Sequence, residues 1–119
     1  REKENSLCQT LFPTLQHTIV STGGGIILNE DNRSIIQKSG FVVWLVASPD
    51  ILAERVSRGQ SRPLLTGKDI PTLVENLVSS RNPLYEQTCH FVVNTGEKTP
   101  FQVATLIWTK FNDRKFSKN

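Results

Sequence analysis

The sequence predicts an α/β fold, a three-layer α/β/α arrangement built around a parallel sheet. Three observations predict it: short apolar runs are each followed by a segment of helical periodicity, this alternation occurs three times, and the links are short. Such alternation forms right-handed crossovers, which give a parallel sheet with helices on both faces. At 119 residues the chain is expected to be one domain with a single core.

The first third of the chain predicts two helices around a short strand. Residues 1–11 carry apolar side chains four apart, as a helix does, and Pro13 closes or kinks it. Residues 18–21 are predicted to be a short buried strand that runs into three glycines. Asn29 then caps a helix that stops at Gly40.

The middle of the chain predicts the main strand and two more helices. Residues 41–46 are continuously apolar, as expected of a central parallel strand covered on both faces. Ser48 and Pro49 are a helix N-cap and a first helical residue. Another helix opens at Asp69, and we expect it to break at Pro83.

The end of the chain predicts a strand followed by a helix. Residues 90–93 form the third strand, and Thr99 begins the last helix, with Trp108 and Phe111 at core positions. Residues 113–119 are polar and expected to fray.

The three glycines are the most informative stretch. Glycine loses more backbone entropy on folding than any other residue, so three together after a strand need a reason. A tight turn without a ligand is one explanation. The other is a bare backbone whose N–H groups face a small polar ligand beyond the carboxyl end of a strand, where α/β sheets bind ligands.

Charge, cysteine content and hydropathy indicate which partners and which compartment to expect. The formal net charge of +3 suits anionic small molecules but is too weak and scattered for nucleic acid, and the strand aromatics Phe41 and Trp44 fit a core. Cys8 and Cys89 predict free thiols in a reducing compartment. No apolar run approaches the roughly 20 residues that span a bilayer, and no signal peptide is evident, so we expect no membrane partner and a cytoplasmic protein.

Arginine residues supply the candidate anion-binding groups. Arg55, Arg58 and Arg62 fall in one helix end and the loop after it, while Arg81 stands before a proline. The planar guanidinium matches carboxylate and phosphate oxygens two at a time. A solvated surface role is the alternative for each, and the proline-braced Arg62 and Arg81 favour a binding role. His17 and His90 lack an acidic partner at a telling spacing and are expected to be structural or exposed.

Three motifs in order, Thr22-Gly23-Gly24-Gly25, Arg62-Pro63-Leu64-Leu65 and Arg81-Asn82-Pro83-Leu84-Tyr85, resemble those of the shikimate kinase family, in the P-loop, nucleoside-monophosphate-kinase-like group. Arg1 with Glu4 three residues later is similar to a further family pattern. The resemblance covers nearly the whole chain. It implies ATP-dependent phosphorylation of the shikimate 3-hydroxyl in chorismate and aromatic amino-acid biosynthesis, with ATP and Mg²⁺ as cofactors.

On the acceptor side, the resemblance implies that Arg1 and Arg81 hold the shikimate carboxylate and that Glu4 orients the arginine. The backbone of the glycines would meet the substrate hydroxyls, and the residues implied here are Gly23, Gly24 and Gly25.

On the nucleotide side, the resemblance implies that Arg62 is a catalytic lid arginine that reaches the transferring phosphoryl group. Arg55 and Pro100 would sandwich adenine, and Lys98 occupies a position that is often basic in the family. Residues 58–69 would be the lid, and residues 95–100 the adenine loop.

The sequence departs from the family's pattern in one important respect. The 119 residues contain no G-x-x-x-x-G-K-[ST] phosphate loop, and the strand that carries the family's substrate-contacting aspartate is also missing. We therefore expect a partial kinase domain that lacks the first strand-helix-strand segment, is inactive alone, is unstable alone, and has its metal ligands before Arg1. The chain is then either the later two-thirds of a kinase or a noncatalytic relative, and the retained Arg62 favours the first.

Two other classes are weaker alternatives. Another small-molecule kinase of the same group would share the fold and lid, but the paired arginines favour a carboxylate-bearing acceptor. A small nucleic-acid binder would need aromatic residues interleaved with Lys or Arg on a sheet. We expect a monomer that binds shikimate and ATP, and a plastid location stays open.

Overall fold

The computed structural model describes residues 2–59 and 69–117. The described residues form five α-helices and two strands, with two short 3₁₀ helices (η) near the start. In order, the elements are α1 (Glu2–Leu11), η1 (Phe12–Thr14), η2 (Gly24–Leu28), α2 (Glu30–Ser39), β1 (Val43–Val46), α3 (Pro49–Gly59), α4 (Asp69–Thr88), β2 (Phe91–Asn94) and α5 (Pro100–Ser117).

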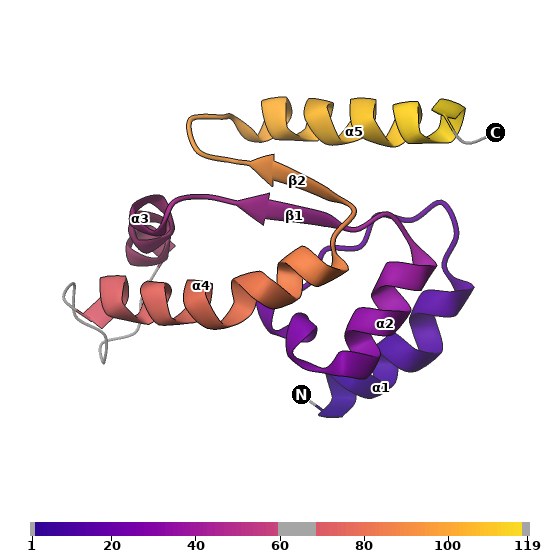
Figure 1. The fold of residues 1–119 in the computed structure, drawn as a ribbon, viewed down its shortest axis with the longest axis horizontal. Coiled ribbons are helices and arrows are strands. Elements are labelled where there is room, and N and C mark those ends of the chain that lie inside the picture. The colour runs from indigo at the N-terminus through magenta and orange to yellow at the C-terminus, as the bar shows by residue number, and fades with distance from the viewer. Residues whose placement is uncertain (1, 60–68, 118–119) are drawn as a thin grey trace.

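The two strands lie side by side and run parallel (Figure 1). The register pairs Val43 with Phe91 and Val46 with Asn94. One further bond continues the ladder beyond the strands, because the Thr95 N–H donates to the Val46 carbonyl at 2.7 Å. Since α3 and α4 connect β1 to β2, this is a parallel crossover of the kind expected for an α/β fold, and the predicted class is confirmed.

The helices pack in pairs around this sheet. α1 lies beside α2, α3 lies against α4, and α5 runs along β2 (Figure 1). The 3₁₀ helix η2 contacts both α2 and α4. The glycine segment, residues 23–25, therefore lies beside two helices that are far apart in the sequence, since α2 ends at Ser39 and α4 begins at Asp69.

The core of the described residues is small and divided between the sheet and the helices. Its buried apolar residues come from α1, η2, α4, β2 and the residue after β1: Cys8, Ile26, Ile27, Ala47, Ile70, Val74 and Val93. Ile26 and Ile27 are the two residues of η2 in this set, so burial of their side chains anchors the segment that begins with Gly24.

Helix starts follow the caps that the sequence predicts. The Asn29 side chain accepts a hydrogen bond from the Asn32 N–H at 3.1 Å, and Ser48 Oγ accepts one from the Ile51 N–H at 3.3 Å. At α5, the Thr99 N–H donates to Gln102 Oε1 at 2.8 Å and the Gln102 N–H donates to Thr99 Oγ1 at 3.1 Å. This reciprocal pair is a capping box.

The strand predicted for residues 18–21 is wrong. These residues form no regular element, and Ile19 is 98% exposed. The sheet formed by the described residues contains β1 and β2, and residues 18–21 do not pair with either strand. The glycines instead lead into η2, with Gly23 at its N-cap position.

The predicted burial of β1 on both faces is also wrong. Leu45 is 56% exposed, and the other three residues of β1 are half-buried. A central strand needs a neighbour on each edge, whereas β1 has one in the part of the chain that the structure describes.

Two helices are longer than predicted. α4 continues through Pro83 to Thr88, so the expected break is absent. Proline removes one backbone donor from the helix. After Pro83, Thr88 Oγ1 donates to the Leu84 carbonyl at 2.8 Å, and the Cys89 N–H donates to the Tyr85 carbonyl at 2.9 Å. These two bonds continue the helix to its end. α5 continues to Ser117, so residues 113–117 are helical and not an irregular tail.

The predicted core role of Trp108 is wrong, whereas Phe111 makes an aromatic contact. Trp108 is 65% exposed. Phe111 is half-buried, and its ring centroid lies 5.8 Å from that of Phe41. Only part of the apolar side of α5 therefore covers the sheet.

Candidate functional site

Three residues from η2 and α4 converge on one point. Tyr85 Oη donates a hydrogen bond to the Gly24 carbonyl at 2.8 Å. A Cβ added at Gly24 would lie 2.9 Å from Tyr85 Oη and 3.2 Å from Arg81 Nη1. The Arg81 guanidinium therefore lies against the side-chain-free backbone of Gly24, and no larger residue fits without moving one of the two side chains.

Helix geometry brings Arg81 and Tyr85 together. The two residues are four apart in α4 and so lie on one face, one turn apart. The Tyr85 ring is tilted at 34° to that of Trp44, with centroids 5.7 Å apart. This contact with β1 and the bond to Gly24 hold the ring at both ends.

Arg81 is the candidate anion-binding group at this point. It is half-buried, and its side chain forms no hydrogen bond or ion pair with the described residues. A guanidinium has five N–H donors arranged in a planar fork. Since Arg81 keeps them available beside bare backbone, the arrangement can bind a small carboxylate through two parallel hydrogen bonds.

The glycine segment is supported from behind by α2. Asn32 is 0% exposed, and its Nδ2 donates to Asn5 Oδ1 at 2.6 Å and to the Ile26 carbonyl at 3.4 Å. Arg33 Nη1 donates to the Ile27 carbonyl at 2.8 Å. Two consecutive side chains of α2 thus hold two consecutive carbonyls of η2.

A second group of polar residues lies after β2. Arg55 Nη1 donates to Thr95 Oγ1 at 2.9 Å, and Arg55 Nη2 donates to the Thr95 carbonyl at 3.3 Å. Thr95 is buried, and its hydroxyl also donates to the Val46 carbonyl at 3.0 Å. These bonds tie the Arg55 guanidinium to the loop that leads to Pro100, while the residue itself stays exposed.

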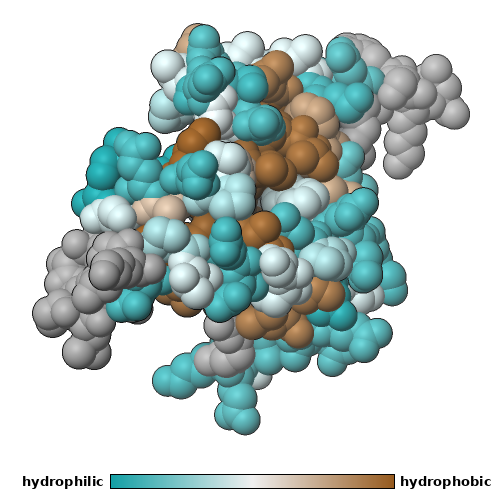
Figure 2. Space-filling view, turned by 60° about the vertical axis from the view of Figure 1, so that its left-hand side comes forward, coloured by the Kyte–Doolittle hydropathy of each residue, from teal (hydrophilic) through white to brown (hydrophobic). Residues whose placement is uncertain are grey.

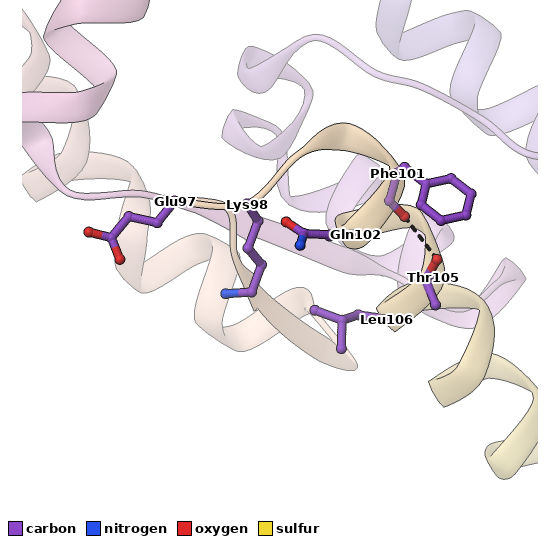
Figure 3. A pocket seen from close by; sticks show the side chains of 7 residues that line it. Glu97, Lys98, Phe101, Gln102, Thr105 and Leu106 are labelled. Atoms are coloured by element: carbon purple, nitrogen blue, oxygen red, sulfur yellow. Dashed lines mark hydrogen bonds between the residues drawn. The ribbon is translucent and has the colours of Figure 1, made fainter.

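An open pocket of about 530 Å³ adjoins this loop. Figure 3 shows Lys98, Gln102 and Leu106 along it, with Glu97 pointing away from the other labelled side chains. Lys98 Nζ donates to the Asn94 carbonyl at 2.8 Å, so the ammonium group is held near the end of β2. Arg55 and Pro100 are not among the residues that line the pocket.

The residues expected at the site fall into two groups. Gly24 and Arg81 meet directly, with Gly23 and Gly25 on either side of Gly24 in the chain. Glu4 lies on α1, half-buried and next to Asn5 in the sequence. Arg55, Lys98 and Pro100 lie around the loop after β2. Arg1, Arg62 and residues 60–68 of the expected lid lie outside the described residues.

Sequence reasoning missed the roles of Tyr85 and Asn32. Tyr85 belongs to the Arg81-Asn82-Pro83-Leu84-Tyr85 motif, so its position beside Arg81 on the helix was a usable signal. Asn32 gave none, because an asparagine in the first turn of a helix is usually solvated.

The cysteine thiols are free, and neither histidine lies in a catalytic arrangement with the other described residues. Cys8 and Cys89 are free, as predicted, and burial raises the pKa of each thiol, with the Glu4 carboxylate raising that of Cys8 further. His90 Nδ1 accepts a hydrogen bond from the Val42 N–H at 2.9 Å, and His17 is exposed, in line with a structural and a surface role.

The described residues show neither a metal-ligand cluster nor a membrane-spanning helix. Within residues 2–59 and 69–117, no three His, Cys, Asp or Glu side chains cluster as metal ligands would. The described helices include none that is both long and apolar enough to cross a bilayer.

The comparisons with known proteins agree with one another. The family model described as shikimate kinase matches residues 1–112. Shikimate kinase from Neisseria gonorrhoeae is 42% identical over 96 residues, which cover 81% of this chain and 71% of that protein. Shikimate kinase 2 from Yersinia enterocolitica is 39% identical over 118 residues, which cover 97% of this chain and 66% of that protein.

A solved structure extends the similarity to the fold. Shikimate kinase from Acinetobacter baumannii, in complex with shikimate, matches with a TM-score of 0.83 and 25% identity, over 96% of this chain and 63% of that one. For several Neisseria relatives the matched part is 56% of their length. The chain thus spans between 56% and 71% of the length of these relatives.

Proposed function

Because the chain belongs to the shikimate kinase family, we propose that it serves the ATP-dependent phosphorylation of the 3-hydroxyl of shikimate. One observation carries the proposal: the half-buried Arg81 lies against the bare backbone of Gly24 with its donors unpaired among the described residues. A carboxylate-bearing acceptor is the ligand that this pair suits best.

On the acceptor side, Arg81 binds the carboxylate of shikimate through its guanidinium. The N–H groups of the glycine segment, Gly23, Gly24 and Gly25, are proposed to face the ring hydroxyls. Arg1 supplies a second cation for the carboxylate, and Glu4 on α1 orients it. The contact of Tyr85 with Gly24 supports this arrangement, because it fixes the distance between α4 and the glycine segment.

On the nucleotide side, Arg55 and Pro100 flank the adenine ring, with Lys98 near the loop. The two bonds from Arg55 to Thr95 support this role, because they fix the plane on which a ring would stack. ATP use is common to the family, and Mg²⁺ commonly accompanies it. The described residues include no cluster of three His, Cys, Asp or Glu side chains that could hold the metal.

Arg62 is proposed to reach the transferring phosphoryl group. Phosphoryl transfer spreads negative charge over the equatorial oxygens, and a positioned arginine stabilises that charge. Removing such a group lowers kcat more than it raises KM. Arg62→Ala in the full gene product should therefore depress kcat, and an unchanged kcat would remove this role.

Arg81→Ala is the direct test of acceptor binding. We expect the loss of charge-assisted bonds to weaken shikimate binding by about 2–5 kcal/mol, measured by isothermal titration calorimetry. Arg81→Lys keeps the charge but not the fork, and should recover only part of the affinity. Lys38→Ala removes one positive charge from the end of α2 and should bind like the unchanged chain. Equal affinity of Arg81→Ala and Lys38→Ala would overturn the proposal.

One observation favours a second candidate, a noncatalytic shikimate-binding relative. The 119 residues contain no G-x-x-x-x-G-K-[ST] phosphate loop, and we expect them to transfer no phosphate by themselves. A kinase assay on the full gene product separates the candidates: turnover supports the kinase, whereas shikimate binding without turnover supports the relative. Cytoplasmic location and a monomeric state stay predictions.

A further inference from the structure

The side chain of Asn32 joins three separate elements. It lies on α2, it donates to Asn5 Oδ1 on α1 at 2.6 Å and to the Ile26 carbonyl on η2 at 3.4 Å, and it is fully buried. Its Oδ1 accepts a bond from Gln9 Nε2, also on α1, at 3.4 Å. No other side chain among the described polar residues is buried to this extent.

Every hydrogen-bonding group of this amide is matched. The two Nδ2 hydrogens have one acceptor each, on different elements, and the oxygen has a donor. A buried amide with all its partners holds those partners in one geometry, because losing any of them leaves a buried polar atom unpaired. The Asn5 bond is the shortest of the three and so fixes α1 most tightly.

Two of the elements that Asn32 joins, η2 and α1, carry residues of the acceptor site. Ile26 follows directly after the glycine segment, and its N–H donates to the Gly23 carbonyl at 3.3 Å. Asn5 follows directly after Glu4. A single amide therefore sets how the glycine backbone lies relative to the end of α1.

We propose that Asn32 is a positioning residue for shikimate binding, which places the glycine segment and the Glu4 end of α1 at the separation that the acceptor requires. This inference rests on the proposed function. Asn32 is fully buried and is expected to make no contact with substrate, so it acts through its neighbours.

Asn32→Asp tests the role with almost no change of shape. The carboxylate loses both Nδ2 donors and sets an oxygen against the Asn5 amide oxygen and the Ile26 carbonyl. Asn5 can turn its amide to donate instead, but the Ile26 carbonyl can only accept and so loses its partner. We expect the Kd for shikimate to rise by about tenfold to a hundredfold, because the glycine segment no longer stays where the acceptor requires it.

A purely structural role predicts a different result. Val93→Ala removes buried apolar volume from β2, away from the glycine segment, and serves as a destabilised control. Calorimetry on the full chain is run well below the melting temperature of every variant. Val93→Ala should keep the Kd of the unchanged chain, and only Asn32→Asp should speed hydrogen exchange at the amides of residues 24–27.

A second variant keeps the proposal falsifiable if Asn32→Asp does not fold. Asn5→Ala removes one partner from a half-buried position on α1 and should raise the Kd several-fold. Two results would overturn the positioning role alone. One is that Asn5→Ala binds shikimate with the Kd of the unchanged chain. The other is that Asn32→Asp and Val93→Ala have equal Kd values. An unchanged chain that binds no shikimate overturns the proposed function, and this role with it.

Discussion

Position 24 requires glycine because two neighbouring side chains occupy the space of a Cβ, and not because of its backbone conformation. None of the described glycines has a positive φ, so alanine could adopt the backbone angles found here. What excludes a side chain is the approach of Tyr85 Oη and Arg81 Nη1 to the place where its Cβ would be.

At the residue scale, Gly24→Ala should therefore weaken shikimate binding without abolishing folding. The new methyl group displaces Tyr85 Oη from its bond to the Gly24 carbonyl, at about 1 kcal/mol, and moves Arg81 with it. Calorimetry should show a Kd raised by about tenfold, because Arg81 no longer meets the carboxylate in the same position. Gly40→Ala is the matched control, because no atom lies within 4 Å of its added Cβ and its φ of −164° is extended. Wild-type affinity in Gly24→Ala would contradict the close approach.

Cys8 gives a prediction that is independent of any ligand. Burial, and then the Glu4 carboxylate, raise the pKa of its thiol above the ordinary 9.0, and the residue is 3% exposed. Since the thiolate is the nucleophile, iodoacetamide should label Cys8 more slowly at neutral pH than the half-buried Cys89. Mass spectrometry of the labelled peptides measures both rates, and equal rates would contradict the burial of Cys8.

The raised pKa also fixes the sign of a pH effect. The protonated thiol is favoured in the folded state, so its contribution to stability is complete below the unfolded-state value of 9.0. It is lost as the pH rises through the higher pKa of the folded state. Cys8→Ala lacks this titration, so its melting temperature should fall less steeply on the alkaline side.

Residue types at the site could be predicted only where local chemistry sets them apart. A triple glycine and a proline-braced Arg81 are unusual in any context, and the structure brings Gly24 and Arg81 together. Asn32 is different, because its burial depends on Asn5 and Gln9, which lie 27 and 23 residues away along the chain. Nothing in the local sequence around Asn32 reports those partners.

At the element scale, helix ends proved predictable and strands less so. The caps at Asn29, Ser48 and Thr99 act within three or four residues, so the sequence around each contains the whole interaction. A strand needs a neighbour from elsewhere. Residues 91–94 have one and form β2, whereas residues 18–21 have none and form no strand.

Thr99→Ala tests the energetics of such a cap. The change removes the acceptor for the Gln102 N–H at the start of α5 and should lower the free energy of unfolding by about 0.5–2 kcal/mol in urea denaturation. Thr105→Ala makes the same substitution inside α5, where alanine is the better helix former, so stability should hold or rise slightly. A cost at Thr105 equal to that at Thr99 would show that the capping box contributes nothing.

At the scale of the whole molecule, the chain exposes more surface than its mass requires. Its accessible area is 8915 Å², against about 6500 Å² for a folded monomer of 13.4 kDa. Its radius of gyration is 15.9 Å, against about 13.5 Å for a compact domain of this length. Figure 2 shows apolar side chains reaching the surface in more than one place.

This exposed apolar surface should bind a hydrophobic dye in native buffer. Large apolar residues are exposed on the segment before η2, on β1 and on α5: Ile19, Leu45, Phe101 and Trp108. Exposed apolar side chains take up 8-anilinonaphthalene-1-sulfonate, whose fluorescence then rises. Ile19→Lys and Trp108→Lys should each lower the signal, because each replaces an exposed apolar side chain with a charged one. Gln16→Lys adds the same charge on the same segment as Ile19 without removing an apolar group, and should leave the signal unchanged. Fluorescence no higher than in buffer, or equal in all three variants, would mean that these side chains are covered in solution.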